Sequence, residues 1–292
     1  MKKQYIYAGV SVLAWSTLAP FTKLLLSSMP NFQVLFICSL IAALFLFVVN
    51  VATGNIKKMR AYKATDYIKM AGLGVLGLFL YMALYNTGLA NLTAQQACVA
   101  NYLWPIMTVI FSCIILKEKM TVMKAVAMLC SFIGIVILTS GVDVSASQGG
   151  AVIGIISCLI AAACYGLFSV LNNKVDYDLK ISMMIAWGAA AVLSLPLGLI
   201  FEEWVPVVGA QWLGYLWLGV IGDGLAYLTW AIALKGTKNT ATIANLAYLT
   251  PFMSLSISAV LLKEGFDPRA IVALVFIIGG ILVQSIVAAR KR

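Results

Sequence analysis

The sequence predicts an all-α membrane protein of ten transmembrane helices, arranged as two inverted repeats of five helices each. Three observations carry this prediction: an apolar composition, ten long apolar stretches, and a pattern that recurs at half the chain length. Of the 292 residues, 63% are hydrophobic and 10% are charged, and the mean hydropathy is +1.01. Soluble domains are about 45–50% apolar and about 25% charged. The composition therefore excludes a soluble globular protein.

Charged and turn-forming residues divide the chain into ten apolar stretches. A hydrocarbon core of about 30 Å requires about 20 helical residues, and each stretch supplies that length. The first stretch exceeds the roughly 7–15 apolar residues of a signal peptide, so we expect an uncleaved first span. The stretches are residues 4–27, 31–53, 66–89, 93–116, 119–140, 150–171, 180–201, 211–234, 240–262 and 267–289.

The recurring pattern is clearest where the fourth and ninth stretches end, at L-K-E-K (116–119) and L-K-E-G (262–265). Glu264 follows Glu118 by 146 positions, half of the 292 residues, and residues 94–137 align with 240–283 without a gap. Each copy holds five spans, an odd number, so the second copy enters the membrane from the opposite side. We expect one repeat at 1–141, an inverted repeat at 150–292 and a linker at 142–149. Inverted repeats are typical of secondary transporters.

The positive charges indicate orientation rather than a nucleic-acid partner. With the N-terminus in the cytoplasm, all but three of the 20 lysine and arginine residues fall on the inner side. The exceptions are Lys263 and Arg269 on the outer side and Lys23 within the first span. By the positive-inside rule, we expect a multi-pass protein of the cell (inner) membrane with both termini cytoplasmic.

The residue inventory argues against catalysis. Histidine is absent, which removes Ser-His-Asp and Cys-His chemistry and histidine-ligated zinc. The six cysteines lie inside apolar stretches without a C-x-x-C pattern, as expected of small buried hydrophobes. The glycines at 72, 74 and 77 match G-x-G-x-x-G, but inside a span they favour close helix packing over nucleotide binding. We expect no enzyme activity, no catalytic residue, no cofactor and no metal.

Two prolines are expected to break the fourth and ninth spans. Pro105 and Pro251 lie within these spans, where each removes a hydrogen-bond donor and frees the carbonyl four residues earlier, at Asn101 and Ala247. A broken helix is tolerated in lipid only where protein or a water-lined cavity satisfies the backbone. We therefore expect both spans to line a central cavity; the alternative is a packing kink filled by a neighbouring side chain.

Aromatic and polar residues near the middle of the spans form a candidate substrate cavity. Tyr81 and Tyr85 share one helical face, as do Tyr227 and Trp230 in the corresponding eighth span. Aromatic walls with a few polar tips suit a solute that is part apolar and part charged, although interfacial aromatic belts are the alternative. The full candidate set is Trp15, Tyr81, Tyr85, Asn101, Tyr102, Trp104, Tyr165, Tyr227, Trp230, Asn245 and Tyr248.

Asp223, in the middle of the eighth span, is the candidate coupling residue. A charge at the centre of a transmembrane helix costs about 2.5–3.5 kcal/mol on insertion scales. Our hypothesis is that this side chain is protonated in one half of a transport cycle or pairs with a substrate amine. The alternative is a structural aspartate, neutral or hydrogen-bonded to Gln95, Gln96 or Asn245. Lys23 is expected to extend to the outer interface rather than to pair with Asp223.

These features together resemble the drug/metabolite transporter superfamily, EamA type. The resemblance is carried by the ten spans, Trp15 in A-W-S-T, Tyr-Leu-x-Pro in the fourth and ninth spans, and the closing acidic residues Glu118 and Glu264. N-Y-L-W-P at 101–105 resembles the branch that exports aromatic amino acids and tolerates cationic drugs such as methyl viologen. The second copy, A-Y-L-T-P, departs from it with Thr250 in place of tryptophan.

The resemblance implies a carrier that exports small amphipathic solutes, namely aromatic or other neutral amino acids and also cationic drugs, by alternating access around a midplane cavity. Protons are the candidate coupling ion, the expected partners are a small-molecule solute and the lipid bilayer, and the functional unit is expected to be a monomer. Three alternatives stay open: a channel or lipid scramblase, a carrier for a nucleoside or quaternary amine, and an intramembrane enzyme.

Overall fold

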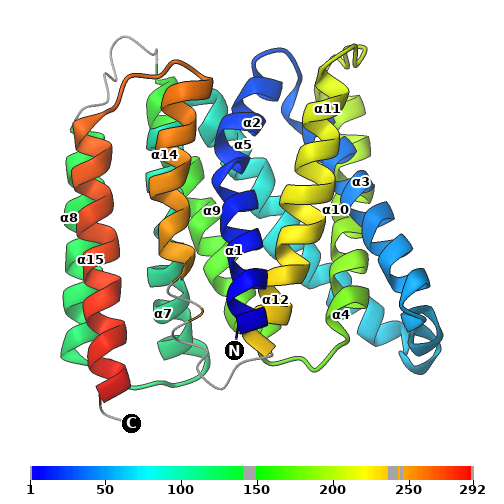
Figure 1. Ribbon diagram of the computed structural model, residues 1–292, viewed down its shortest axis with the longest axis horizontal. Helices are drawn as coiled ribbons and strands as arrows, with labels where there is room; N and C mark the ends of the chain where they lie inside the picture. The colour runs from blue at the N-terminus through cyan, green and yellow to red at the C-terminus, as the bar shows by residue number, and fades with distance from the viewer. Residues whose placement is uncertain (1, 141–148, 236–242, 244–245, 291–292) are drawn as a thin grey trace.

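The regular structure consists of helices packed side by side, nearly parallel to a common axis (Figure 1). The computed structural model describes residues 2–140, 149–235, 243 and 246–290, and it contains no β-strand within them. The expected linker at 142–149 falls almost entirely outside these residues. The helices are α1 (Lys2–Ser16), α2 (Leu18–Leu26), α3 (Asn31–Ala52), η1 (Asn55–Ala61), α4 (Ala64–Gly74), η2 (Val75–Leu80), α5 (Tyr81–Asn91), α6 (Ala94–Asn101), α7 (Trp104–Ile115), α8 (Val122–Thr139), α9 (Gly150–Asn172), α10 (Leu179–Phe201), α11 (Gln211–Leu216), η3 (Trp217–Leu225), α12 (Ala226–Lys235), η4 (Leu246–Tyr248), α14 (Leu249–Leu261) and α15 (Pro268–Arg290).

Seven helical segments of the described chain are long and apolar enough to cross a membrane, which confirms the all-α membrane class. They correspond to the first seven expected spans, from Lys3–Leu26 to Leu179–Phe201. The expected eighth span is continuous from Gln211 to Lys235 through α11, η3 and α12. The ninth and tenth appear as the shorter apolar helices Leu246–Leu261 and Pro268–Val283. The count of ten spans stays a prediction.

Equivalent helices of the two expected repeats pack against each other in opposite directions. α3 and α10 are the second helices of each repeat; Glu202, after the end of α10, bonds the start of α3, and Asn50, near the end of α3, bonds the Lys180 carbonyl at the start of α10. α8 and α15, the fifth helices, also pack together. Between the repeats, α5 of the third span packs on α9, the first helix of the second repeat. In the same way, α12 of the eighth span, the third of the second repeat, packs on α1, the first helix of the first repeat. These pairings are what a two-fold axis in the membrane plane produces.

The contact between α8 and α15 depends on one glycine from each repeat. A Cβ added to Gly134 would lie 2.8 Å from the carbonyl oxygen of Ala273, and one added to Gly280 would lie 3.1 Å from Cα of Ala127. These glycines are 146 positions apart, like the L-K-E motifs, so they occupy equivalent places on two antiparallel helices. Small residues at such crossings let the backbones approach closely in lipid.

Both faces of the molecule can be named from the chain ends. The start of α1 and the end of α15 lie at the same edge, the lower one in Figure 1, which we call the termini face. The opposite edge, which carries the start of α3 and the end of α10, is the far face.

The third and eighth spans each contain a π-helical segment, η2 and η3. Such segments add a residue to a helical turn and occur often at functional sites. Tyr81 follows η2 and Tyr227 lies just after η3, again 146 positions apart. At that interval, Gly77 in η2 corresponds to Asp223 in η3. The repeats therefore share the distortion and differ in the side chain placed there.

We predict that Gly280→Val destabilises the protein, because the added methyl groups meet the backbone of α8 at Ala127. Overpacking of a well-packed contact typically costs about 1–3 kcal/mol. The adjacent Gly279→Val is the matched control, since a Cβ at that position meets no atom within 4 Å. Reversible unfolding in mixed micelles measures both variants. Equal losses for the two would contradict the close crossing.

Candidate functional site

A central cavity lies between helices of both expected repeats. Its volume is about 80 Å³, counted as the space open to the centre of a water molecule. Eight of the eleven candidate substrate residues line it: Trp15, Tyr81, Tyr85, Asn101, Tyr102, Trp104, Tyr165 and Tyr227. The remaining lining residues were not among the candidate substrate residues; they are Leu18, Ala19, Cys98, Ala247, Thr250 and Ser254. Thr250 and Ser254 could have been found, since they lie one position before and three positions after Pro251 on the expected cavity helix.

The other three candidates are Trp230, Tyr248 and Asn245. Trp230 does not line the cavity; its ring lies 5.3 Å from that of Trp15 and packs with the small apolar cluster that includes Ala8 and Ile243. Tyr248 is half-buried against the main hydrophobic core. Asn245 lies outside the described residues. Trp230 therefore packs against the cavity-lining ring of Trp15 without lining the cavity itself. The spacing of Trp230 and Tyr227 along the helix does not distinguish these two positions.

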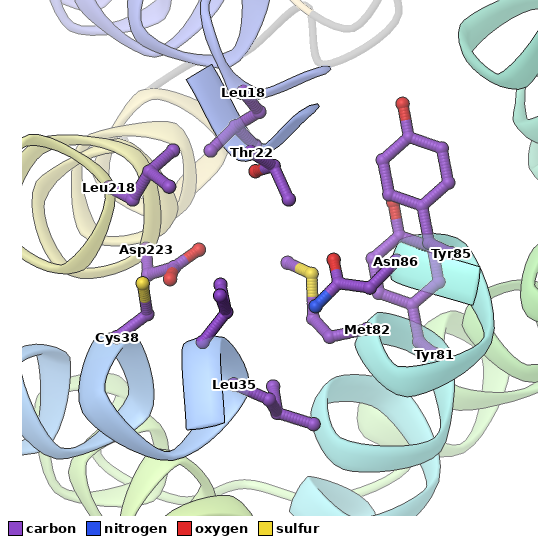
Figure 2. Close-up of a pocket in the computed structure, with 11 residues that line it drawn as sticks. Leu18, Thr22, Leu35, Cys38, Tyr81, Met82, Tyr85, Asn86, Leu218 and Asp223 are labelled. Atoms are coloured by element: carbon purple, nitrogen blue, oxygen red, sulfur yellow. The ribbon is translucent and has the colours of Figure 1, made fainter. Parts of the chain in front are cut away.

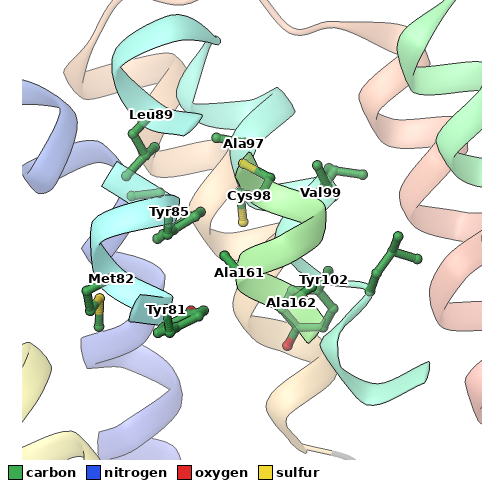
Figure 3. Close-up of a cluster of buried hydrophobic side chains, with 14 of the residues drawn as sticks. Tyr81, Met82, Tyr85, Leu89, Ala97, Cys98, Val99, Tyr102, Ala161 and Ala162 are labelled. Atoms are coloured by element: carbon green, nitrogen blue, oxygen red, sulfur yellow. The ribbon is translucent and has the colours of Figure 1, made fainter. Parts of the chain in front are cut away.

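The cavity wall is a connected set of aromatic rings. Tyr81 stacks on Tyr85 with ring centres 5.9 Å apart, and Tyr81 and Trp104 each contact Tyr165, at 4.9 Å and 5.2 Å. Figure 3 shows Tyr81 and Tyr85 projecting from α5 towards α9, where Ala161 and Ala162 leave room for them. Because each ring is held by another ring, the wall presents fixed apolar faces to a solute.

A second group of rings also contributes to the cavity wall, where Trp15 meets Tyr227 edge-on with ring centres 5.3 Å apart. Tyr227 is in turn held by Trp187, whose side chain is 0% exposed. This second group of rings comes from α1, α10 and α12, so aromatic residues of both expected repeats enclose the same space.

Some polar atoms near the cavity have no hydrogen-bond partner among the described residues. The Asn101 Nδ2 group donates to the Tyr81 hydroxyl at 2.9 Å, but Asn101 Oδ1 is unpaired. Trp15 Nε1 is also buried without such a partner, whereas the Thr250 and Ser254 hydroxyls lie within hydrogen-bonding reach of Tyr102 and Cys98. Buried polar groups are nearly always hydrogen-bonded in native proteins. Unpaired donors and acceptors at one cavity are therefore suited to bind the polar atoms of a solute or water.

The backbone is broken in the fourth and ninth spans. α6 ends at Asn101 and α7 begins at Trp104, just before Pro105, while a 3-10 turn, η4, precedes Pro251 in α14. The Tyr102 hydroxyl donates to the carbonyl of Ala247, which is the carbonyl that Pro251 frees. Tyr102 belongs to one expected repeat and Ala247 to the other. The proline break in the ninth span is thus satisfied by a side chain from the fourth.

Asp223 lines a smaller cavity of about 30 Å³, measured in the same way, which adjoins the central one. The two cavities share Leu18, Tyr81 and Tyr85 as lining residues. Asp223 is only 5% exposed, and its Oδ1 has no hydrogen-bond partner within the described chain. Figure 2 shows its carboxylate next to Cys38, facing the space towards Thr22 and Asn86.

The alternative reading of Asp223 was a structural aspartate hydrogen-bonded to Gln95, Gln96 or Asn245. Two of these three residues are bonded to other groups. Gln95 bonds the carbonyl of Gly265 and the N–H of Asp267. Gln96 forms a capping box with Thr93 at the start of α6. The third, Asn245, lies outside the described residues.

Lys23 does not neutralise Asp223. Its ammonium group donates to the carbonyls of Leu89, at 2.7 Å, and of Leu92, at the end of α5. The sequence analysis expected the Lys23 side chain to extend to the outer interface and did not consider these carbonyls. The last carbonyls of a helix have no partner within the helix and can accept hydrogen bonds from a side chain. Favourable placement of a cation at a helix C-terminus accounts for the position.

At the far face, two carboxylates bind the N-termini of transmembrane helices from the opposite repeat. Glu264 accepts from the backbone N–H groups of Ala94, at 2.9 Å, and Gln95. Glu202 accepts from those of Phe32, at 2.9 Å, and Gln33, at 3.1 Å. In both cases an anion meets the unpaired N–H groups and the positive end of the helix dipole.

A glutamine completes each of these two contacts. Gln33 bonds both the N–H and the carbonyl of Val205, and Gln95 bonds Asp267 N–H and Gly265 carbonyl in the same manner. We call these two groups the carboxylate caps. Together they connect α3 to the end of α10 and α6 to the end of α14.

The duplicated L-K-E motif has the same backbone in both copies but different side-chain partners. Lys117 and Lys263 have positive φ angles of 55° and 54°, so both helices end in the same left-handed turn. Glu264 forms a carboxylate cap, whereas Glu118 pairs with Lys124 at 2.9 Å and its side chain is 50% exposed. Residues 240 and 241, which correspond to the Glu264 partners Ala94 and Gln95, lie outside the described chain.

A central cavity lined by aromatic rings and unpaired polar atoms, in a bundle of helices long and apolar enough to cross a membrane, is the arrangement expected of a membrane transporter. The chain belongs to the EamA-like transporter family, which matches residues 2–140 and again residues 152–286. The two matches report the duplicated unit independently of the L-K-E pattern.

Curated relatives include transporters of distant organisms. An uncharacterized transporter of Clostridium kluyveri is 26% identical over 97% of this chain and 93% of its own length. The aromatic amino acid exporter YddG of Ancylobacter novellus is 29% identical over 74% of this chain and 76% of its own. Protein PecM of Dickeya dadantii is 26% identical over 75% and 73%. A crystal structure with 23% identity superposes with a TM-score of 0.71 over 100% of this chain and 99% of that one, and shows the same fold.

We predict that Tyr102→Phe destabilises the protein by about 1–3 kcal/mol, the cost of an unsatisfied buried carbonyl, here that of Ala247. The double variant Tyr102→Phe/Pro251→Ala should recover most of this loss, because an alanine N–H at 251 can bond the carbonyl four residues earlier. Unfolding in mixed micelles, with Pro251→Ala as reference, measures the effect. A double variant no more stable than Tyr102→Phe would refute the assignment.

We also predict that Glu264→Gln costs about 0.5–2 kcal/mol of stability, the usual range for loss of a helix cap. Glu118→Gln, the equivalent change in the other repeat, should cost about 0–1 kcal/mol, because Glu118 forms an exposed ion pair. Gln95→Ala should be non-additive with Glu264→Gln, since both act on one cap. Equal costs for the two glutamate variants in the unfolding assay would contradict the asymmetry.

Proposed function

We propose that the protein is a secondary transporter that moves small amphipathic solutes by alternating access around the central cavity. The observation that carries the proposal is the position of this cavity, enclosed by aromatic rings of both repeats, where the broken fourth and ninth spans meet. Because the repeats are inverted, a state open to one side has a counterpart of similar structure open to the other.

The two carboxylate caps at the far face support a two-state mechanism. Glu264 and Glu202 each hold a helix N-terminus of the opposite repeat through hydrogen bonds to backbone N–H groups. We propose that the carboxylate caps hold the far face together in this state and release when the repeats exchange conformations. The hydrogen bonds of the caps are few, so the two states can lie close in free energy.

The chemistry of the cavity supports amphipathic solutes that contain a ring. Rings held edge-on and stacked offer faces for an aromatic or aliphatic group, and the unpaired atoms of Asn101 and Trp15 offer polar contacts. Aromatic and other neutral amino acids and cationic drugs fit this description. The similarity to an aromatic amino acid exporter is consistent with it.

We further propose that the protein lies in the cell membrane with both termini cytoplasmic, exports its solute, acts as a monomer and has no enzymatic activity. The basic residues near the termini face support the orientation. Asp223 is the proposed coupling residue, because a single buried carboxylate can exchange a proton for another cation.

A channel or scramblase is the second candidate. It would account for polar atoms in the middle of the bundle but needs neither a duplicated inverted unit nor paired caps. Counterflow separates these functions, because only a carrier exchanges labelled for unlabelled solute against a concentration difference.

We predict counterflow of labelled tryptophan or tryptamine into proteoliposomes loaded with the same unlabelled solute. Trp104→Ala should lower the exchange rate at least about tenfold, equivalent to about 1.4 kcal/mol. The reason is that Trp104 lines the central cavity, and the variant removes one of its aromatic rings. Trp212→Ala is the matched control, since Trp212 is exposed on the outside of the bundle. Equilibration without counterflow would favour the channel, and full activity of Trp104→Ala would remove the cavity from the transport path.

A further inference from the structure

The lining of the two adjoining cavities is chemically one-sided. It contains one carboxylate, Asp223, and no lysine or arginine among the residues the structure describes. The other ionisable groups near Asp223 are Cys38 on α3, Tyr81 and Tyr85 on α5, and Tyr227 on α12, which are neutral in their ordinary state. The nearest lysine on the first span, Lys23, is bound to carbonyls at the end of α5.

A buried carboxylate of this kind requires a positive partner. Burial of an ionised group away from water is costly unless the group is paired. Within the described chain Asp223 Oδ1 has no donor, and the carboxylate faces the small cavity beside Thr22 and Asn86 (Figure 2). The partner must therefore come from the cavity, either as a proton or as a cationic group of a solute.

The two cavities differ in size, so each suits a different part of one solute. The space beside Asp223, about 30 Å³, exceeds the roughly 10–15 Å³ that one water needs, which suits an ammonium group rather than a ring. The central cavity, about 80 Å³ by the same measure, has the aromatic walls. Tyr81 and Tyr85 belong to both linings, so they form the boundary across which one solute can extend.

A second negative charge next to Asp223 would weaken binding. A zwitterionic α-amino acid carries its carboxylate and its ammonium group on the same carbon atom, so binding at Asp223 would bring two carboxylates close together. Like charges in a poorly solvated site repel strongly. Neither cavity lining supplies a cationic side chain to offset that repulsion.

We propose that Asp223 and the small cavity form a subsite for the ammonium group of a cationic amphipathic amine, so that this protein selects amines that lack a carboxylate over zwitterionic amino acids. This inference rests on the proposed transport function and specifies its substrate class. The subsite exists once per molecule, because the equivalent of Asp223 in the first repeat is Gly77, which packs against Phe168.

Three indole compounds test the charge requirement with one ring. Tryptamine is cationic, tryptophan is zwitterionic and indole-3-propionate is anionic. We expect tryptamine to compete for binding at least about tenfold more strongly than tryptophan, with no competition by indole-3-propionate. Binding to purified protein by thermal shift and exchange by counterflow are measured separately. Tryptophan binding as tightly as tryptamine would overturn the proposal.

Asp223→Asn removes the charge while keeping the shape of the side chain. We expect it to weaken tryptamine binding at least about tenfold and to abolish the preference over tryptophan. Asp176→Asn, in the exposed connection between α9 and α10, is the matched control and should leave the preference unchanged. An Asp223→Asn variant that melts like the wild type but retains the preference overturns the subsite.

The two proposals fail in different ways. If the wild type shows the charge-dependent binding but no counterflow of any indole, the subsite stands and the transport proposal falls. If counterflow occurs with equal rates for tryptamine and tryptophan, transport stands and the subsite falls. Should Asp223→Asn fail to fold, Asn86→Asp supplies the second variant: an added carboxylate facing the same cavity should raise the tryptamine preference, and no change would count against the subsite.

Discussion

The structure depends on one constraint: in hydrocarbon, every backbone donor and acceptor must find its partner within the protein. Pro251 leaves the carbonyl of Ala247 without its helical partner, and the Tyr102 hydroxyl from the other repeat supplies the missing bond. The break in the ninth span therefore lies where the two repeats meet. That requirement places the break, the polar atoms around it and the aromatic rings in the same central region, and so determines where a solute can bind.

The same constraint explains the carboxylate caps. The N-termini of α3 and α6 lie at the far face, where their first N–H groups have no helical acceptor. Glu202 and Glu264, each located just past the end of a helix of the opposite repeat, supply the acceptors. Contacts between repeats at the far face are thus made of a few directional, charged bonds, in contrast to the tight glycine contact of α8 with α15.

Pseudo-symmetry gives the frame, and departures from it give the specificity. Equivalent positions carry the same left-handed turn at Lys117 and Lys263, the same π-helical distortion in η2 and η3, and tyrosines at 81 and 227. They differ at Gly77 and Asp223, and at Trp104 and Thr250. Two similar halves suit exchange between two states, while single, unduplicated side chains make the cavities between them asymmetric.

The sequence by itself determined the helical membrane class, the inverted duplication and the positions of the breaks, because apolar length, repeat interval and proline are local or periodic signals. It also identified most rings of the cavity by their depth. Only the tertiary structure decided that Trp230 packs against Trp15 without lining the cavity, and that Gln95 bonds Gly265 and Asp267 rather than Asp223. It also decided that Lys23 donates to a carbonyl at the end of α5. These contacts join helices far apart in the chain, and the rotation of one helix against another leaves no trace in the spacing of its residues.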